Sequence, residues 1–319
     1  MGGFFHAVGT FFHHLAAVGW ASLGIALLFQ FARLLARIPA WRNILRAAYP
    51  ESRVRWRSVY GSYIAGVGVN AILPARSGDF LKLYLLKHRL EGSSYPTLGS
   101  TLIVETLFDS LAAAGILAWA FSIGVLPSLH FQRRSLPQVD WTWPLRHPEL
   151  AAVIAAAWLT VIVLFAVIGI RRARAFKAHF RQGFMILGDR MRFLREVASW
   201  QALSWVLRGA SIYFFLQAFH VHATAHNVLL VLAVQSISTL LPFTPGGVGT
   251  QQGFLVYVFR KTKPRISEAT VLSFSIGMYI AVTLLSVVLG FAAIFVMLRT
   301  FRWRRVVAPE EKKAYARGP

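Results

Sequence analysis

The sequence predicts an all-α, polytopic membrane protein that carries an internal repeat of inverted topology. Three observations predict it: the composition is apolar, long uncharged runs recur, and two hydrophobic stretches are broken by proline and glycine. Of the 319 residues, 56% are hydrophobic and 14% are charged, whereas a soluble domain carries about 25% charged residues. The function is therefore expected to lie within the bilayer.

Five apolar runs are long enough to cross a bilayer, for which about 20 residues suffice. They are Thr10–Ala32, Ser100–Ile123, Leu150–Ile170, Trp200–Phe219 and Glu268–Leu298. The first run has no basic segment before it and no cleavage site behind it, so we expect a retained helix and not a signal peptide. Two further stretches are interrupted: Val59–Leu86 breaks at Pro74–Gly78, and Val228–Phe259 breaks at Pro242–Gly249.

The distribution of positive charge predicts the orientation. The net charge is +22, and 22 of the 34 Lys and Arg residues fall in three blocks, 33–57, 171–195 and 299–319. Such blocks remain on the cytoplasmic side. We therefore expect an inner cell-membrane protein with its N-terminus outside and its C-terminus in the cytoplasm. No basic block forms a domain of its own, which argues against nucleic-acid binding.

With this orientation, each interrupted stretch is predicted to be a re-entrant helical hairpin, and the two enter from opposite faces. The span, hairpin and span of residues 10–123 would mirror those of residues 200–298. A linking span with a cytoplasmic amphipathic helix (150–198) and a basic tail (299–319) would complete a single transmembrane domain over residues 1–319. The alternative is two ordinary kinked spans in each half. Four positive residues at 260–265, on a predicted outer loop, count against the hairpins.

The arginine-rich stretches 34–57 and 172–198 contain interleaved apolar residues. They are predicted to form interfacial amphipathic helices that contact anionic lipid at the cytoplasmic face. Plain topogenic loops would explain their charges equally well. In the second stretch the helical spacing of Phe180, Phe184, Leu187 and Met191 favours a helix.

The two broken turns are candidate anion sites, because non-helical backbone at membrane depth must find polar partners. Free N–H groups in a glycine-rich turn bind anions, and an arginine can hold a phosphate with two hydrogen bonds. Arg76 is equally well explained by a salt bridge to Asp79 that only holds its own turn together. The candidate substrate-binding residues are Asn70, Arg76 and Asp79 in the first turn, and Thr244, Gly246, Gly247 and Gly249 in the second.

Three charged residues fall inside predicted spans. Glu105 and Asp109 lie four residues apart, on one face of their helix, and Arg208 lies near the middle of another span. A charge at the bilayer centre costs at least about 2.5–3.5 kcal/mol, so it must face a partner or a cavity. We expect Arg208 to pair with Glu105 or Asp109. Structural neutralisation and a direct role in substrate binding are both open.

No enzyme is expected. The sequence contains no cysteine, which excludes thiol catalysis and thiolate metal sites. It has no nucleotide-binding glycine loop, no metalloprotease motif and no nucleophile elbow. We expect no cofactor and no metal.

Three motifs resemble those of the lysylphosphatidylglycerol synthase transmembrane-region family, also called the flippase-like domain family. They are NAILPARSGD at 70–79, VETLFD at 104–109 and LPFTPGGVG at 241–249, and the resemblance covers nearly the whole chain. The family often has Glu-Arg-x-x-Asp in the second motif. Thr106 replaces that arginine here, and Arg208 could supply the missing positive charge.

This resemblance implies a lipid transporter or flippase that moves a phospholipid or a polyprenyl-phosphate-type lipid. Its anionic head group would bind where the two hairpins meet. About twenty residues follow the last predicted span, so we expect no soluble synthase domain. The alternative is an accessory subunit or an enzyme of lipid-linked sugar, hopanoid or aminoacyl-lipid metabolism.

Overall fold

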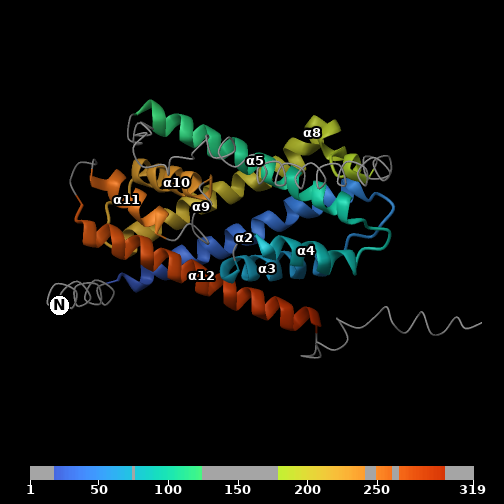
Figure 1. Cartoon of the computed structure of the whole chain (residues 1–319), viewed down its shortest axis with the longest axis horizontal. Helices are drawn as coiled ribbons and strands as arrows, with labels where there is room; N and C mark the ends of the chain where they lie inside the picture. Colours follow the sequence, from blue (N-terminus) through green and yellow to red (C-terminus); the bar gives the residue numbers. More distant parts are fainter. Residues whose placement is uncertain (1–17, 74–75, 124–178, 241–248, 261–265, 299–319) are drawn as a thin grey trace, which may run out of the picture.

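The computed structural model describes residues 18–73, 76–123, 179–240, 249–260 and 266–298. These residues form helices and no strand (Figure 1). The elements are α2 (Trp20–Ala48), α3 (Trp56–Ile72), α4 (Ser77–Lys87), α5 (Tyr95–Ser122), the 3-10 turn η1 (Met185–Gly188), α8 (Arg190–Phe193), the π-turn η2 (Leu194–Ala198), α9 (Ser199–Ala218), α10 (Ala225–Leu240), α11 (Thr250–Arg260) and α12 (Glu268–Leu298).

Within the described part of the chain, three helices, α2, α5 and α12, are long and apolar enough to cross a membrane. They contain 29, 28 and 31 residues, which corresponds to roughly 42–47 Å against a hydrocarbon core of roughly 30 Å. The outer face of α12 exposes large apolar side chains, among them Leu284, Val288, Phe291 and Val296. The prediction of an all-helical, multi-pass membrane protein is confirmed; the number of spans stays a prediction.

Helices α2 and α9 lie antiparallel along each other. The backbone N–H of Gly19 donates to the carbonyl of Ala218 at 2.9 Å. Further along the pair, the hydroxyl of Ser211 donates to the carbonyl of Ala26, also at 2.9 Å. This arrangement brings the polar residues of the predicted span 200–219 against the second half of α2.

Helices α3 and α4 form a tight helical pair. Their connection begins at Leu73, whose extended backbone (φ −96°, ψ 138°) is the conformation favoured by a residue that precedes proline. The two helices approach so closely that a Cβ on Gly78 would lie 2.0 Å from the carbonyl oxygen of Gly66. Only glycine fits such a contact, and it fixes α4 against α3.

The helix pair α10–α11 has nearly the same dimensions as α3–α4. Helices α10 and α11 contain 16 and 11 residues, and helices α3 and α4 contain 17 and 11 residues. They lie in opposite halves of the molecule along its long axis (Figure 1). Each packs on the last long helix of the other half of the sequence: α3 on α12, and α10 on α5. The α3–α12 contact is close, because a Cβ on Gly68 would lie 2.5 Å from the Cα of Gly290.

The predicted interfacial helix over 34–57 is wrong for residues 34–48. These residues continue α2, and Leu34, Ile38, Trp41 and Leu45 are fully or almost fully buried. They pack with apolar residues of α3, α4 and α5 in one of the molecule's hydrophobic clusters. The arginines of this segment therefore begin inside the helical bundle.

The described part of the second arginine-rich stretch, 179–198, is divided into short elements and is not one amphipathic helix. Ile186 and Val197 are buried there against Ile44 and Val104, while Met191 is exposed. Its apolar residues thus cover the ends of α2 and α5. The predicted span Leu150–Ile170 lies outside the described residues.

Candidate functional site

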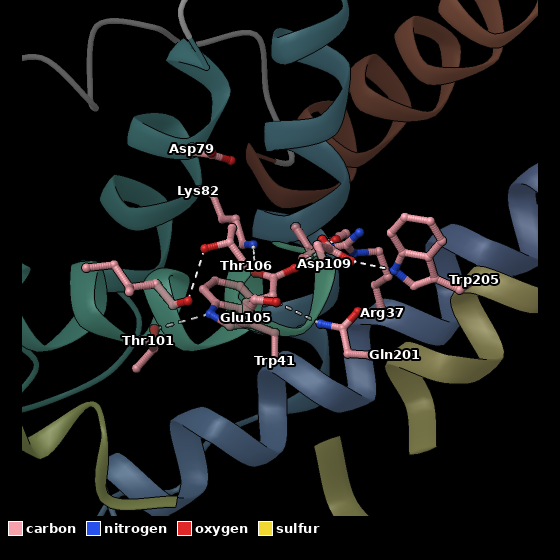
Figure 2. Close-up of polar contacts among 12 residues, drawn as sticks. Arg37, Trp41, Asp79, Lys82, Thr101, Glu105, Thr106, Asp109, Gln201 and Trp205 are labelled. Atoms are coloured by element: carbon pink, nitrogen blue, oxygen red, sulfur yellow. Dashed lines mark hydrogen bonds and ion pairs between the residues drawn. The ribbon is translucent and has the colours of Figure 1, made fainter. Parts of the chain in front are cut away.

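A buried ionic network joins α2, α4 and α5, and its centre is Glu105 of α5 (Figure 2). One carboxylate oxygen accepts a hydrogen bond from Lys82 Nζ of α4 at 2.7 Å. The other accepts from the hydroxyl of Tyr63 at 3.0 Å and from Arg37 of α2 at 3.3 Å. The side chains of Glu105 and Lys82 are only 4% and 5% exposed. Both carboxylate oxygens therefore have cationic partners away from water.

The Lys82 ammonium group also contacts two aromatic faces. Its Nζ lies 4.0 Å from the ring centroid of Trp41 and 4.1 Å from that of Tyr63. The indole N–H of Trp41 donates to the hydroxyl of Thr101 at 3.2 Å, which fixes the ring (Figure 2). Cation–π contacts are strongest where the cation has lost its water. The aromatic rings therefore stabilise a charge that the ion pair with Glu105 already holds.

Asp109 extends the network toward α9. It lies one turn after Glu105 and accepts from Arg37 at 2.5 Å. Its other oxygen accepts from the indole N–H of Trp205 at 2.9 Å. One turn earlier on α9, the amide of Gln201 donates to the backbone carbonyl of Glu105 at 3.2 Å (Figure 2). Arg37 thus bridges both carboxylates, and α9 holds their helix from the other side.

Helical spacing explains why these side chains meet. Residues three or four apart share one face of a helix. Each of the three helices places its polar residues in this way: Gln30, Arg33 and Arg37 on α2; Glu105 and Asp109 on α5; Gln201, Trp205 and Arg208 on α9. The polar faces meet because α9 packs along α2 and both contact α5.

The predicted ion pair of Arg208 with Glu105 or Asp109 is not present. Arg208 donates to the side-chain oxygen of Gln235 on α10 at 2.6 Å, and its guanidinium lies 5.0 Å from the ring centroid of Trp205. Among the described residues it has no ion pair. The cation that these carboxylates require is Arg37, which α2 brings to them because the helix continues beyond the apolar run.

The turn between α3 and α4 is closed by Asn70. Its side-chain oxygen accepts from the backbone N–H of Gly78 at 2.7 Å, and its amide donates to Asp79 at 3.2 Å. The salt bridge considered for Arg76 and Asp79 is not formed. Arg76 is exposed, has no ion pair among the described residues, and adopts a left-handed backbone conformation (φ 54°) directly before α4. Its guanidinium is thus available to a ligand.

The second turn is described only from Gly249, because Thr244, Gly246 and Gly247 lie outside the described residues. Gly249 has a positive φ of 86°, which favours glycine. Its backbone N–H donates to the side-chain oxygen of Gln252 at 2.7 Å, at the start of α11. The predicted approach of this turn to Arg76 stays a prediction.

Four residues of this network were not predicted from the sequence: Arg37, Lys82, Trp41 and Tyr63. A usable signal exists for Arg37: with Gln30 and Arg33 it repeats at helical spacing within an otherwise apolar segment. No comparable pattern marks Lys82, which is one of two lysines in a short helix.

Comparison with known proteins places the chain in a family. A family model described as "Lysylphosphatidylglycerol synthase TM region" matches residues 3–290. A UPF0104 membrane protein of Methanocaldococcus jannaschii is 21% identical over 199 residues, which cover 60% of this chain and 79% of that protein. No solved structure matches the chain significantly. The family model covers both halves of the helical bundle and every residue of the ionic network, and the chain belongs to the lysylphosphatidylglycerol synthase transmembrane-region family.

Proposed function

We propose that this protein is a lipid transporter that binds an amphiphile with an anionic head group and moves that group between the leaflets. The observation that carries the proposal is the buried network of Arg37, Lys82, Glu105 and Asp109. Charged side chains inside membrane helices are costly, and they mark substrate or ion pathways. A purely apolar contact between the same helices would hold them together at lower cost.

The two helix pairs support the transport half of this proposal. Pairs of matching length, each packed on the last helix of the other half, are the arrangement expected of an inverted repeat. In transporters with such repeats the substrate site lies near the bilayer midplane, between interrupted helices. The inverted repeat, the re-entrant hairpins and the single domain of residues 1–319 are parts of this proposal. So are the inner cell membrane, an outer N-terminus and a cytoplasmic C-terminus.

The head group is proposed to bind between the two turns. Arg76, Asp79 and Asn70 would contact it from the first turn, and Thr244, Gly246, Gly247 and Gly249 from the second. Arg76 suits this role because its side chain is exposed and has no ion pair among the described residues. The family name associates such chains with phospholipid, and a phospholipid or a polyprenyl-phosphate-type lipid fits a site rich in cations. The basic residues at the cytoplasmic end would contact anionic lipid there.

The test is leaflet-to-leaflet transfer of a labelled anionic phospholipid in vesicles that contain the purified protein. Arg76→Ala removes one charge-assisted contact, worth about 1.5–3 kcal/mol, and should weaken lipid binding about ten- to a hundredfold. Thermal unfolding should be unchanged, because this side chain is exposed and forms no ion pair with the residues that the structure describes. Arg57→Ala, at another exposed arginine, is the matched control and should transfer lipid like the wild type.

Two results would contradict the proposal. Wild-type protein that moves no lipid above empty vesicles would exclude transport by this chain alone. If it also co-purified with a soluble enzyme, the accessory-subunit alternative would be favoured. Full activity in folded Arg76→Ala protein would remove the first turn from the site.

A further inference from the structure

Positive charge is in excess inside the helical bundle. Four cationic side chains gather around Glu105 and Asp109, and both carboxylates are already engaged by Arg37, Lys82, Tyr63 and Trp205. The remaining two cations are Arg33 on α2 and Arg208 on α9. Neither forms an ion pair with any residue that the structure describes. The described part of the bundle therefore holds two more cationic than anionic groups at this level.

Arg33 has almost no hydrogen-bonding partner. Within the described residues it donates one hydrogen bond, of 3.3 Å, to the side-chain oxygen of Gln30, one turn earlier on α2. Its Nε is buried and has no hydrogen-bond partner in the described residues. A guanidinium has five N–H donors and no acceptor. Most of the donors of Arg33 are therefore available to an incoming group.

Arg208 is held in place from two sides. Gln235 accepts one of its N–H groups at 2.6 Å, and its guanidinium packs on Trp205, whose indole N–H is fixed by Asp109. In the antiparallel pair α2–α9, the hydroxyl of Ser211 donates to the carbonyl of Ala26, and this register places Arg208 about one helical turn from Arg33 along the facing helices. The carboxylate near both arginines is Asp109, which Arg37 and Trp205 already engage, so the two guanidiniums have no counter-charge of their own among the described residues.

We infer that Arg33 and Arg208 form a phosphate-binding subsite between α2 and α9, with Trp205 as its platform. This inference rests on the proposed function, because it names the head-group chemistry that the transporter would accept. A phosphate offers several acceptor oxygens, and the planar guanidinium fork matches two of them at once. One phosphate group can therefore bridge both arginines and remove their mutual repulsion. Arg33 and Arg208 belong to α2 and α9, whereas Arg76 lies between α3 and α4, so the subsite adds a second cationic contact point for the head group.

The experiment measures thermal unfolding of the full chain in detergent, with and without three probes: dioctanoyl phosphatidylglycerol, glycerol phosphate and dioctanoylglycerol. The wild type should be stabilised by the phosphatidylglycerol and not by dioctanoylglycerol, which lacks the phosphate. Glycerol phosphate carries the phosphate without acyl chains, so it distinguishes a site for a free anion from a site for a lipid. Stabilisation by it at similar concentrations would identify a site for the free anion, and a much weaker effect would identify a lipid site.

Arg33→Gln and Arg208→Gln should each weaken the binding of dioctanoyl phosphatidylglycerol about tenfold or more, since each removes a charge-assisted contact. Lipid-free Arg33→Gln protein should be at least as stable as the wild type, because an uncompensated charge has been removed from the bundle. Arg57→Gln, at the cytoplasmic start of α3, should change neither quantity.

Three outcomes overturn the subsite. The first is wild-type binding of dioctanoyl phosphatidylglycerol by both variants. The second is equal stabilisation by dioctanoylglycerol, which would show that only the acyl chains are recognised. The third is a loss of stability in lipid-free Arg33→Gln protein with unchanged lipid binding, which would show that a carboxylate of the chain pairs with Arg33. If the lipid binds as expected but is not moved in vesicles, the subsite stands and the transport proposal fails.

Discussion

The two sides of the polar network differ in how their charge is compensated. Around Lys82, on the α4–α5 side, the ammonium has a carboxylate at 2.7 Å and two aromatic faces. On the α2–α9 side, the described residues offer Arg33 and Arg208 amide oxygens and an aromatic ring as partners, and no ion pair. The cost of placing a charge in the bilayer applies to both. The charge of Lys82 is thus compensated within the protein, whereas Arg33 and Arg208 are suited to a ligand.

Glu105→Gln should have the largest effect on the Lys82 side of the network. It would leave Lys82, and in part Arg37, buried without a counter-charge. Breaking a buried ion pair by removing one partner costs about 3–5 kcal/mol. We expect a large fall in the thermal unfolding temperature of the purified protein, or a loss of folded material on size-exclusion chromatography.

Glu196→Gln is the matched control for Glu105→Gln. Glu196 pairs with Arg192 four residues away at 3.2 Å, and both side chains are about 40% exposed. Such exposed pairs contribute only about 0.3–0.5 kcal/mol. If both glutamine variants lost the same small amount, the buried network would not be what holds α4 and α5 together. A Lys82→Gln change added to Glu105→Gln should restore part of the stability, because the unpaired cation is removed.

A smaller loss of stability is expected from Gly78→Ala, which would push α4 away from α3 on the Lys82 side of the network. The new Cβ would lie 2.0 Å from the carbonyl oxygen of Gly66, so α4 must shift away from α3 and carry Lys82 with it. Overpacking of this kind costs about 1–3 kcal/mol. The measurement is thermal unfolding, with Gly115→Ala as the control, since a Cβ on Gly115 meets nothing within 4 Å. A neutral Gly78→Ala variant would show that the α3–α4 contact is not rigid.

The sequence predicted the anionic half of this network and missed most of the cationic half. Glu105 and Asp109 were recognised because a carboxylate inside an apolar run is conspicuous, and their spacing of four residues places both on one helix face. Arg37 was assigned to a cytoplasmic block instead. An arginine just beyond an apolar run has the same appearance whether it faces lipid head groups or a carboxylate of another helix. Only the packing of α2 against α5 distinguishes the two.

The helix bounds also differ in how well the sequence predicts them. Helix α12 was predicted with the observed bounds, because its length and composition alone define it. Helix α2 was predicted to end at Ala32, yet it continues to Ala48. Hydropathy follows composition, so it ends a predicted span at the first charges. The tertiary contacts that bury Trp41 and Leu45 are between residues distant in sequence and leave no local signal.

The smallest loss of stability is expected from Tyr63→Phe, which tests the Lys82 side of the network without changing Arg33 or Arg208. Tyr63→Phe removes a hydroxyl that donates to Glu105 at 3.0 Å and keeps the aromatic face that contacts Lys82. Glu105 retains both cations, so the loss should be only about 1–2 kcal/mol in thermal or denaturant unfolding. Tyr60→Phe, three residues earlier on α3, is the control, because that tyrosine is 41% exposed. If the two sides have different roles, Tyr63→Phe should lower the stability of the protein and leave its stabilisation by dioctanoyl phosphatidylglycerol unchanged. A Tyr63→Phe variant that kept wild-type stability but lost this response to lipid would reverse the assignment and place the ligand at Glu105.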